Sequence, residues 1–153
     1  MNVVSLIANL ALLAGLEATV AAPVPATASA PKAEIMGLWK GSSICTKVDI
    51  NEFCRDETVV YNFVDVPEQP ATVALKAARL VGNSVQPVYS LYVTYRPDDG
   101  RWTSEFERPQ VRGIWSYVVH GDELTGVATV LPGLTVVRNV EAKRVSKDQV
   151  FAH

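Results

Sequence analysis

The chain has 153 residues, of which 48% are hydrophobic and 20% charged, and its formal net charge is −2. This length fits a single domain once a leader is set aside. Basic and acidic residues are interspersed along the sequence, which excludes a continuous basic surface for nucleic acid or for an anionic membrane.

The first 28 residues have the layout of a secretory signal peptide. Val3–Leu16 is nearly all apolar, and small residues follow it, with cleavage patterns at Ala26–Ala28 and, earlier, at Thr19–Ala21. The apolar run is shorter than the roughly 20 residues that span a bilayer, and no later run is long enough. We therefore predict a cleavable leader over 1–28 and a secreted or periplasmic protein. A buried helix and an uncleaved anchor are the alternatives.

The predicted mature chain starts with a Pro/Ala-rich flexible arm over residues 29–34. A β-barrel domain follows over residues 35–146, and residues 147–153 form a C-terminal tail.

The only two cysteines, Cys45 and Cys54, lie nine positions apart. In an exported chain such a pair forms a disulfide, and a turn between two strands can close it. The bond contributes roughly 2.5–3 kcal/mol by loop-closure arithmetic. A metal pair is disfavoured because neither His120 nor His153 has ligand spacing to the cysteines, and free thiols in a cytosolic protein are the remaining alternative. We predict a disulfide, no metal site and no cofactor.

After Ile35 the sequence is rich in Val, Thr, Tyr and Trp, and turn signals recur roughly every 8 to 12 residues, as in an antiparallel sandwich or barrel. Turn residues such as Pro97–Gly100, Gly82, Gly121 and Pro132-Gly133 indicate hairpins between neighbours, and the last three supply the positive φ angles that hairpins need. We expect an all-β, eight-stranded antiparallel up-and-down barrel, because closure removes exposed sheet edges. The expected strands are Ile35–Cys45, Glu57–Asp65, Thr72–Val81, Pro87–Arg96, Arg101–Glu107, Val111–His120, Glu123–Leu131 and Leu134–Val145.

One expected strand, Thr72–Val81, is also compatible with a helix because of its alanines and basic residues. On the last strand, alternation places Arg138 on the same side as Val140 and Ala142. A buried guanidinium is costly unless it is paired, hydrogen-bonded or stacked on a ring.

Gly37-Leu38-Trp39 on the first strand, with an inward Arg138 on the last, resembles the calycin superfamily of lipocalins, fatty-acid-binding proteins and avidins. The resemblance implies that Trp39 packs near the barrel base against Arg138, by cation–π stacking. The chain is shorter than lipocalins, and its size is nearer to that of avidins and of small bacterial barrel inhibitors of metalloproteases. The pattern W-x-G-x-S-x-C…C-x-D-E-x-V-x-Y also looks like a group of small secreted bacterial proteins with no assigned activity, which implies export and a barrel but no chemistry.

Aromatic residues provide the best candidate site. Small barrels either fill their interiors with side chains or hold one small ligand. We therefore expect either a filled core or a binding module for a small apolar or amphipathic ligand. The candidate ligand-binding residues are Tyr61, Tyr89, Tyr95, Trp115 and Tyr117.

Two other functions remain open. A protein-interaction barrel, such as a protease inhibitor, would use the arm to reach a partner's cleft. A small barrel isomerase or hydrolase would use His120 with Asp122, or the pair Glu105 and Glu107, although an exposed turn and a solvated strand face explain these residues as well. Asp56 and Glu57, beside Cys54, are either a turn acid and a strand start or the partners of a salt bridge to Arg55, Arg112 or Arg144. We assign no catalytic residue.

Overall fold

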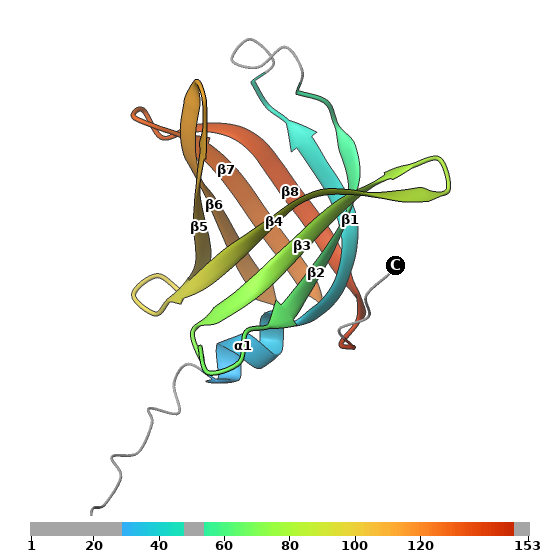
Figure 1. The fold of residues 1–153 in the computed structure, drawn as a ribbon, viewed down its shortest axis with the longest axis vertical. Coiled ribbons are helices and arrows are strands. Elements are labelled where there is room, and N and C mark those ends of the chain that lie inside the picture. Colours follow the sequence, from blue (N-terminus) through green and yellow to red (C-terminus); the bar gives the residue numbers. More distant parts are fainter. Residues whose placement is uncertain (1–28, 48–53, 149–153) are drawn as a thin grey trace, which may run out of the picture.

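The computed structural model describes residues 29–47 and 54–148, so the predicted leader and most of the tail lie outside the described residues. This part of the chain forms a closed barrel in which each strand pairs with its sequence neighbours and β8 pairs with β1 (Figure 1). The prediction of an eight-stranded antiparallel up-and-down barrel is therefore confirmed. The elements are α1 Ser29–Ile35, β1 Gly37–Cys45, β2 Glu57–Asp65, β3 Thr72–Val81, β4 Ser84–Arg96, β5 Arg101–Arg108, β6 Val111–His120, β7 Glu123–Val130 and β8 Thr135–Ser146.

The predicted strand boundaries agree with the structure to within a few residues, and Thr72–Val81 is a strand. The hairpin glycines Gly82, Gly100 and Gly121 have positive φ angles, as their turns require. At the β7–β8 turn the expectation was wrong in detail, because Leu134 rather than Gly133 has the positive φ.

Pairing around the barrel is uneven. Three residue pairs join β4 to β5, from Thr94 opposite Thr103 to Arg96 opposite Arg101. Every other neighbouring pair of strands is joined by at least seven. β4 and β5 therefore meet only near their shared hairpin and diverge toward the opposite end of the barrel (Figure 1).

One end of the barrel, here called the helix end, is closed by α1. Ile35 and Trp39 are fully buried there, and the Trp39 indole N–H donates a 2.8 Å hydrogen bond to the Ile35 carbonyl. Lys32 fixes the helix to the β2–β3 turn through the carbonyls of Val66 and Gln69 at 3.0 and 2.9 Å. Where the sequence indicated a flexible arm over 29–34, the structure has a docked helix, so these residues do not form a free arm.

The partner of Trp39 differs from the expected one. The guanidinium carbon of Arg144 lies 4.0 Å from the centroid of the Trp39 ring, so Arg144 rather than Arg138 forms the cation–π contact. Arg144 also donates to the Asp122 carboxylate at 2.8 Å and to the carbonyls of Met36, Glu34 and Gly121. The helix end is therefore a plug in which the buried cation is fully engaged. In the described part of the chain, no helix is long and apolar enough to cross a membrane.

Candidate functional site

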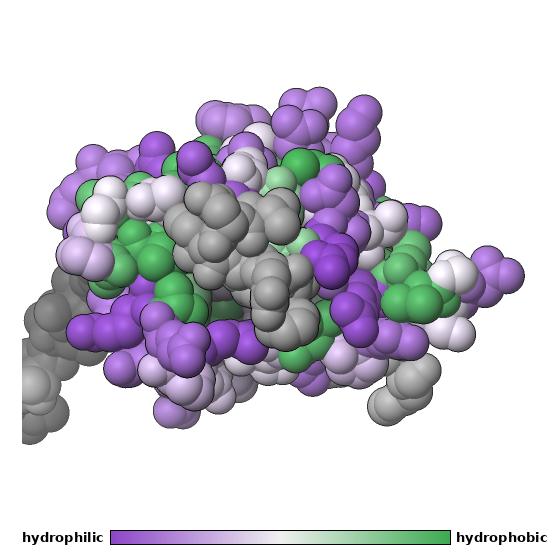
Figure 2. Space-filling view, turned by 90° about the horizontal axis from the view of Figure 1, so that it is seen from above, coloured by the Kyte–Doolittle hydropathy of each residue, from purple (hydrophilic) through white to green (hydrophobic). Residues whose placement is uncertain are grey.

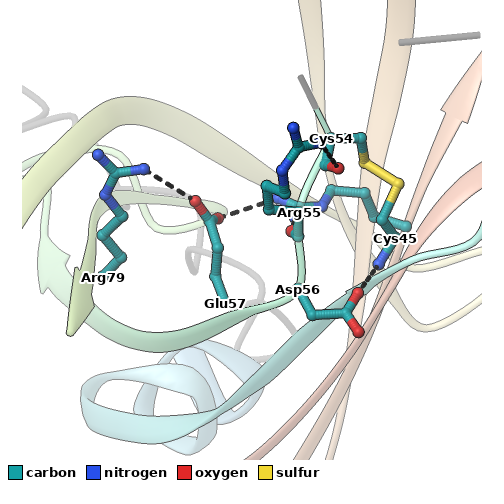
Figure 3. A network of polar contacts seen from close by, with 7 residues as sticks. Cys45, Cys54, Arg55, Asp56, Glu57 and Arg79 are labelled. Carbon is teal, nitrogen blue, oxygen red and sulfur yellow. Dashed lines mark hydrogen bonds and ion pairs between the residues drawn. A yellow bond between two sulfur atoms is a disulfide. The ribbon is translucent and has the colours of Figure 1, made fainter. Parts of the chain in front are cut away.

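The opposite end of the barrel, here called the disulfide end, carries the predicted bond between Cys45 and Cys54, whose Cα atoms are 5.9 Å apart. The bond ties the end of β1 to the residues that precede β2. The Cys45 amide donates a 2.8 Å hydrogen bond to the Asp56 carboxylate, so Asp56 fixes the start of β2 rather than forming an ion pair (Figure 3). Seen from this end, hydrophilic side chains cover much of the surface, with separate hydrophobic patches between them (Figure 2).

Glu57 is held between two arginines. Its carboxylate accepts from Arg79 at 3.2 Å (Figure 3). It also accepts from Arg138 at 3.1 Å, and Arg138 donates to the Arg55 carbonyl as well. The side chains of Glu57 and Arg138 are about one-fifth exposed, at 20% and 19%. Arg138 thus does point inward, as alternation indicated, but it lies at the disulfide end and pairs with Glu57. Two of the three arginines considered for Asp56-Glu57 pair elsewhere, Arg112 with Glu107 and Arg144 with Asp122.

Four of the five predicted ligand-binding aromatics come together below this ion pair. Tyr117 stacks on Trp115 with ring centroids 5.7 Å apart and meets Tyr61 edge-to-face at 6.0 Å. Tyr89 also stacks on Trp115, at 6.1 Å. Tyr95 is not part of this group, because its ring contacts Trp102 near the β4–β5 hairpin, at 5.2 Å.

The interior is almost filled. A cavity of about 10 Å³, room for roughly one water molecule, lies among Ser43, Tyr61, Tyr89 and Arg138. The Gly126 position shows how closely the rings fit, because a Cβ there would come within 2.6 Å of the Tyr117 ring. A large apolar ligand has no space inside this arrangement.

Three buried polar atoms at this end have no hydrogen bond of good geometry within the described part of the chain: Ser43 Oγ, Tyr117 Oη and Arg138 Nε. The Tyr61 hydroxyl lies near Ser43 and near the Tyr117 hydroxyl, so the contacts of these two atoms are weak rather than absent. Ser43 and Arg138 line the cavity, and Tyr117 packs behind Tyr61. An unsatisfied buried polar group costs about 1–3 kcal/mol, and most such groups in folded proteins are paired. The cavity beside Ser43 Oγ and Arg138 Nε is therefore a place where an oxygen atom of a water or ligand would be bound.

Burial keeps the tyrosine hydroxyls protonated. Removal from solvent, followed in size by the neighbouring Tyr89 hydroxyl, raises the pKa of Tyr61 and of Tyr117 far above its usual range. Removal from solvent also raises the pKa of Tyr89. The site therefore presents neutral hydroxyls that donate hydrogen bonds, beside the cationic Arg138.

Sequence reasoning missed Ser43 and Glu57 as site residues. Alternation on β1 places Ser43 on the same face as Trp39 and Gly41, so its inward position could have been predicted. Nothing in the sequence placed Glu57 inside the barrel mouth, because it sits at the first residue of a strand.

The candidate catalytic residues form no catalytic arrangement. Asp122 binds Arg144 and stays 77% exposed, and His120 is exposed at the end of β6. Glu105 and Glu107 lie on the outer, exposed face of β5. Among the residues that the structure describes, no three His, Cys, Asp or Glu side chains gather into a metal site.

The fold and this site define a class of protein: a small, disulfide-bonded, closed eight-stranded barrel with a filled interior, consistent with a calycin-like fold. No known family model matches the chain, and no curated protein matches it. The assignment of the chain to this class therefore rests on its architecture alone.

Proposed function

We propose that this protein is a binding module whose site is the disulfide end of the barrel. The ligand is small and amphipathic, with an oxygen acceptor held by Arg138 and Ser43, and with Tyr117 behind them, and an apolar part against Trp115. The observation that supports this proposal is that two buried polar atoms without a good hydrogen bond, Ser43 Oγ and Arg138 Nε, belong to residues that line one small cavity. The disulfide suits an oxidising compartment, in line with the predicted export.

Ligand access requires one side chain to move. Tyr89 is half-buried, while Tyr61 and Tyr117 are fully buried, so Tyr89 is the lining tyrosine that can swing outward. It lies beside the irregularity in β3–β4 pairing at Ala77/Ala78. We therefore place the ligand's apolar part where the Tyr89 ring now sits, which limits the ligand to about the size of one aromatic ring.

The substitution Tyr117→Phe separates a binding role from a structural one. It removes a hydroxyl without a good hydrogen bond while keeping the ring that stacks on Trp115, so we expect the free energy of unfolding to stay unchanged or to rise by up to about 1 kcal/mol. Ligand affinity should fall at least threefold. Urea unfolding and calorimetric titration measure the two quantities.

Benzoate and benzylamine are suitable probes, because they share a ring and differ in the polar group. We expect benzoate to bind and to shift the amide resonances of Ser43 and Tyr89, and benzylamine, which has no acceptor oxygen, to leave them unchanged. Native mass spectrometry of the purified protein should also show a small co-purifying molecule. Equal responses to both probes, or none to either at millimolar concentration with no co-purifying molecule, contradict the proposal.

A further inference from the structure

A second feature of the barrel borders the disulfide-end site and shares Tyr89 with it: the edges of β4 and β5 beyond their short ladder. The Tyr95 amide donates to the Ala71 carbonyl at 2.8 Å, so the backbone N–H and C=O groups of Tyr95 point toward β3. Backbone direction alternates along a strand, so Thr94, Tyr92 and Ser90 direct their N–H and C=O groups toward β5. Thr94 finds Thr103 there, but Tyr92 and Ser90 have no strand partner among the described residues.

The facing edge of β5 is unpaired in the same way. Thr103 is opposite Thr94, so Glu105 and Glu107 direct their backbone groups toward β4. In the described chain their N–H groups meet no strand on that side, and the Glu105 carbonyl accepts only a long 3.5 Å hydrogen bond from Ser104. Two strand edges with free donors and acceptors therefore face the same gap.

The two sides of the gap differ in chemistry. The inward side chains beside it are apolar and half-buried, with Tyr89 and Leu91 on β4 and Phe106 on β5. The outward side chains are the 70% exposed Tyr92 and the acidic Glu105 and Glu107. A strand placed here would contact apolar groups with one set of alternate side chains and acidic groups with the other.

We propose that the gap between β4 and β5 binds an extended peptide segment of a partner protein, which adds to the free edge of β4 as a further strand. Only a polypeptide backbone presents donors and acceptors at the spacing that this edge requires. Charge complementarity with Glu105 and Glu107 selects a segment in which apolar residues alternate with basic ones.

The edge also limits the length of the segment. Pro87 has no N–H, and the β3–β4 register shifts between Ala77 and Ala78. Regular pairing along this edge of β4 therefore ends just before Ser90. The paired stretch therefore runs from Ser90 to Tyr92 and accepts roughly four to five residues of the segment. The antiparallel orientation to β4 is favoured, because antiparallel ladders are slightly more stable.

Hydrogen exchange tests the edge in the free protein. We expect the amides of Ser90 and Tyr92 to exchange much faster than those of Leu91 and Val93, which face β3. Protection of Tyr92 that grows with protein concentration would instead assign the edge to a second copy of the chain. That result, or strong protection in the dilute monomer, overturns the proposal.

A capped seven-residue peptide of alternating lysine and valine tests the binding. We expect it to slow exchange at Ser90 and Tyr92, with an affinity that weakens as salt is added. The same peptide with N-methyl groups on its lysines keeps its side chains but loses the donors that face β4, so it should bind at least tenfold more weakly. Equal binding of the two peptides, or no protection by either, overturns the proposal.

Matched variants of the protein complete the test. Tyr92→Pro removes an edge N–H that β3 does not use, whereas Tyr92→Ala removes only the exposed ring. We expect Tyr92→Pro to lower peptide affinity about tenfold and Tyr92→Ala to lower it less than threefold, with the fold of each checked by circular dichroism. Glu105→Lys should weaken binding of the basic peptide and reduce its salt dependence. Benzoate binding at the disulfide end should be unchanged in all three, which separates this surface from that site.

Discussion

The two ends of the barrel each hold an inward arginine from the same strand, and the two arginines are used differently. Arg144, at the helix end, stacks on Trp39 and donates to one carboxylate and three carbonyls, and its side chain is 7% exposed. Arg138, six residues earlier, binds Glu57 and the Arg55 carbonyl and leaves its Nε unpartnered among the described residues. One cation is saturated by the fold, and the other retains a free donor.

The contrast between the two arginines indicates that the helix end is the structural one. A buried charge is tolerated when its hydrogen-bonding groups are satisfied, and Arg144 meets that condition. At the disulfide end the chain keeps unsatisfied donors beside a small cavity, an arrangement that lowers stability and is expected where something else binds. The two ends therefore make opposite predictions for stability and for binding.

The largest expected effect is at the helix end. Trp39→Ala removes a fully buried indole, its hydrogen bond to Ile35 and its stacking on Arg144, so the free energy of unfolding should fall by roughly 3–5 kcal/mol. Urea denaturation measures the loss. A decrease below about 1 kcal/mol would show that the plug does not hold this end together.

The two arginines provide a direct comparison. Arg144→Ala leaves several buried carbonyls without their donor and should cost about 3 kcal/mol. Arg138→Ala should cost about 1 kcal/mol, because Glu57 keeps Arg79 as a partner, but it should abolish benzoate binding. Thermal unfolding and titration of both variants check the order, and the reverse order in stability would contradict the assignment of the two ends.

The last expected effect is zero at neutral pH and appears only in the alkaline range. The folded protein keeps Tyr61, Tyr89 and Tyr117 protonated above pH 10, where the unfolded chain loses these protons, so stability is constant below about pH 9 and falls above pH 10. Each tyrosine contributes a slope of about 1.4 kcal/mol per pH unit. Tyr117→Phe should reduce the total slope by that amount, and an unchanged slope would place the Tyr117 hydroxyl in contact with solvent.

Much of the barrel could be predicted from the sequence, because side-chain alternation and turn residues report the strands directly. Alternation also placed Arg138 inward. Alternation could not tell at which end of the barrel Arg138 lies. A period of two fixes the face of a side chain, but it does not fix the register between β1 and β8, which are distant in sequence. The actual register places Trp39 opposite Arg144 and Cys45 opposite Arg138, with an irregularity between Leu38 and Trp39.

The remaining differences have the same origin in long-range contacts. The helix α1 is fixed by Lys32 through carbonyls more than thirty residues away, which local composition does not reveal. The unpartnered atoms of the site and the free edge of β4 are relations between several strands. Candidate aromatics could be named from the sequence, but their grouping, with Tyr95 outside it, required the fold.

The disulfide has a consequence for where the protein can work. The bond between Cys45 and Cys54 is remote from the plug and next to the segment that positions Asp56, Glu57 and the Arg55 carbonyl. In a reducing compartment the strands and the plug would persist, while the partners of Arg138 would lose their anchor. On the proposed function, the reduced chain would keep its fold but bind its ligand more weakly.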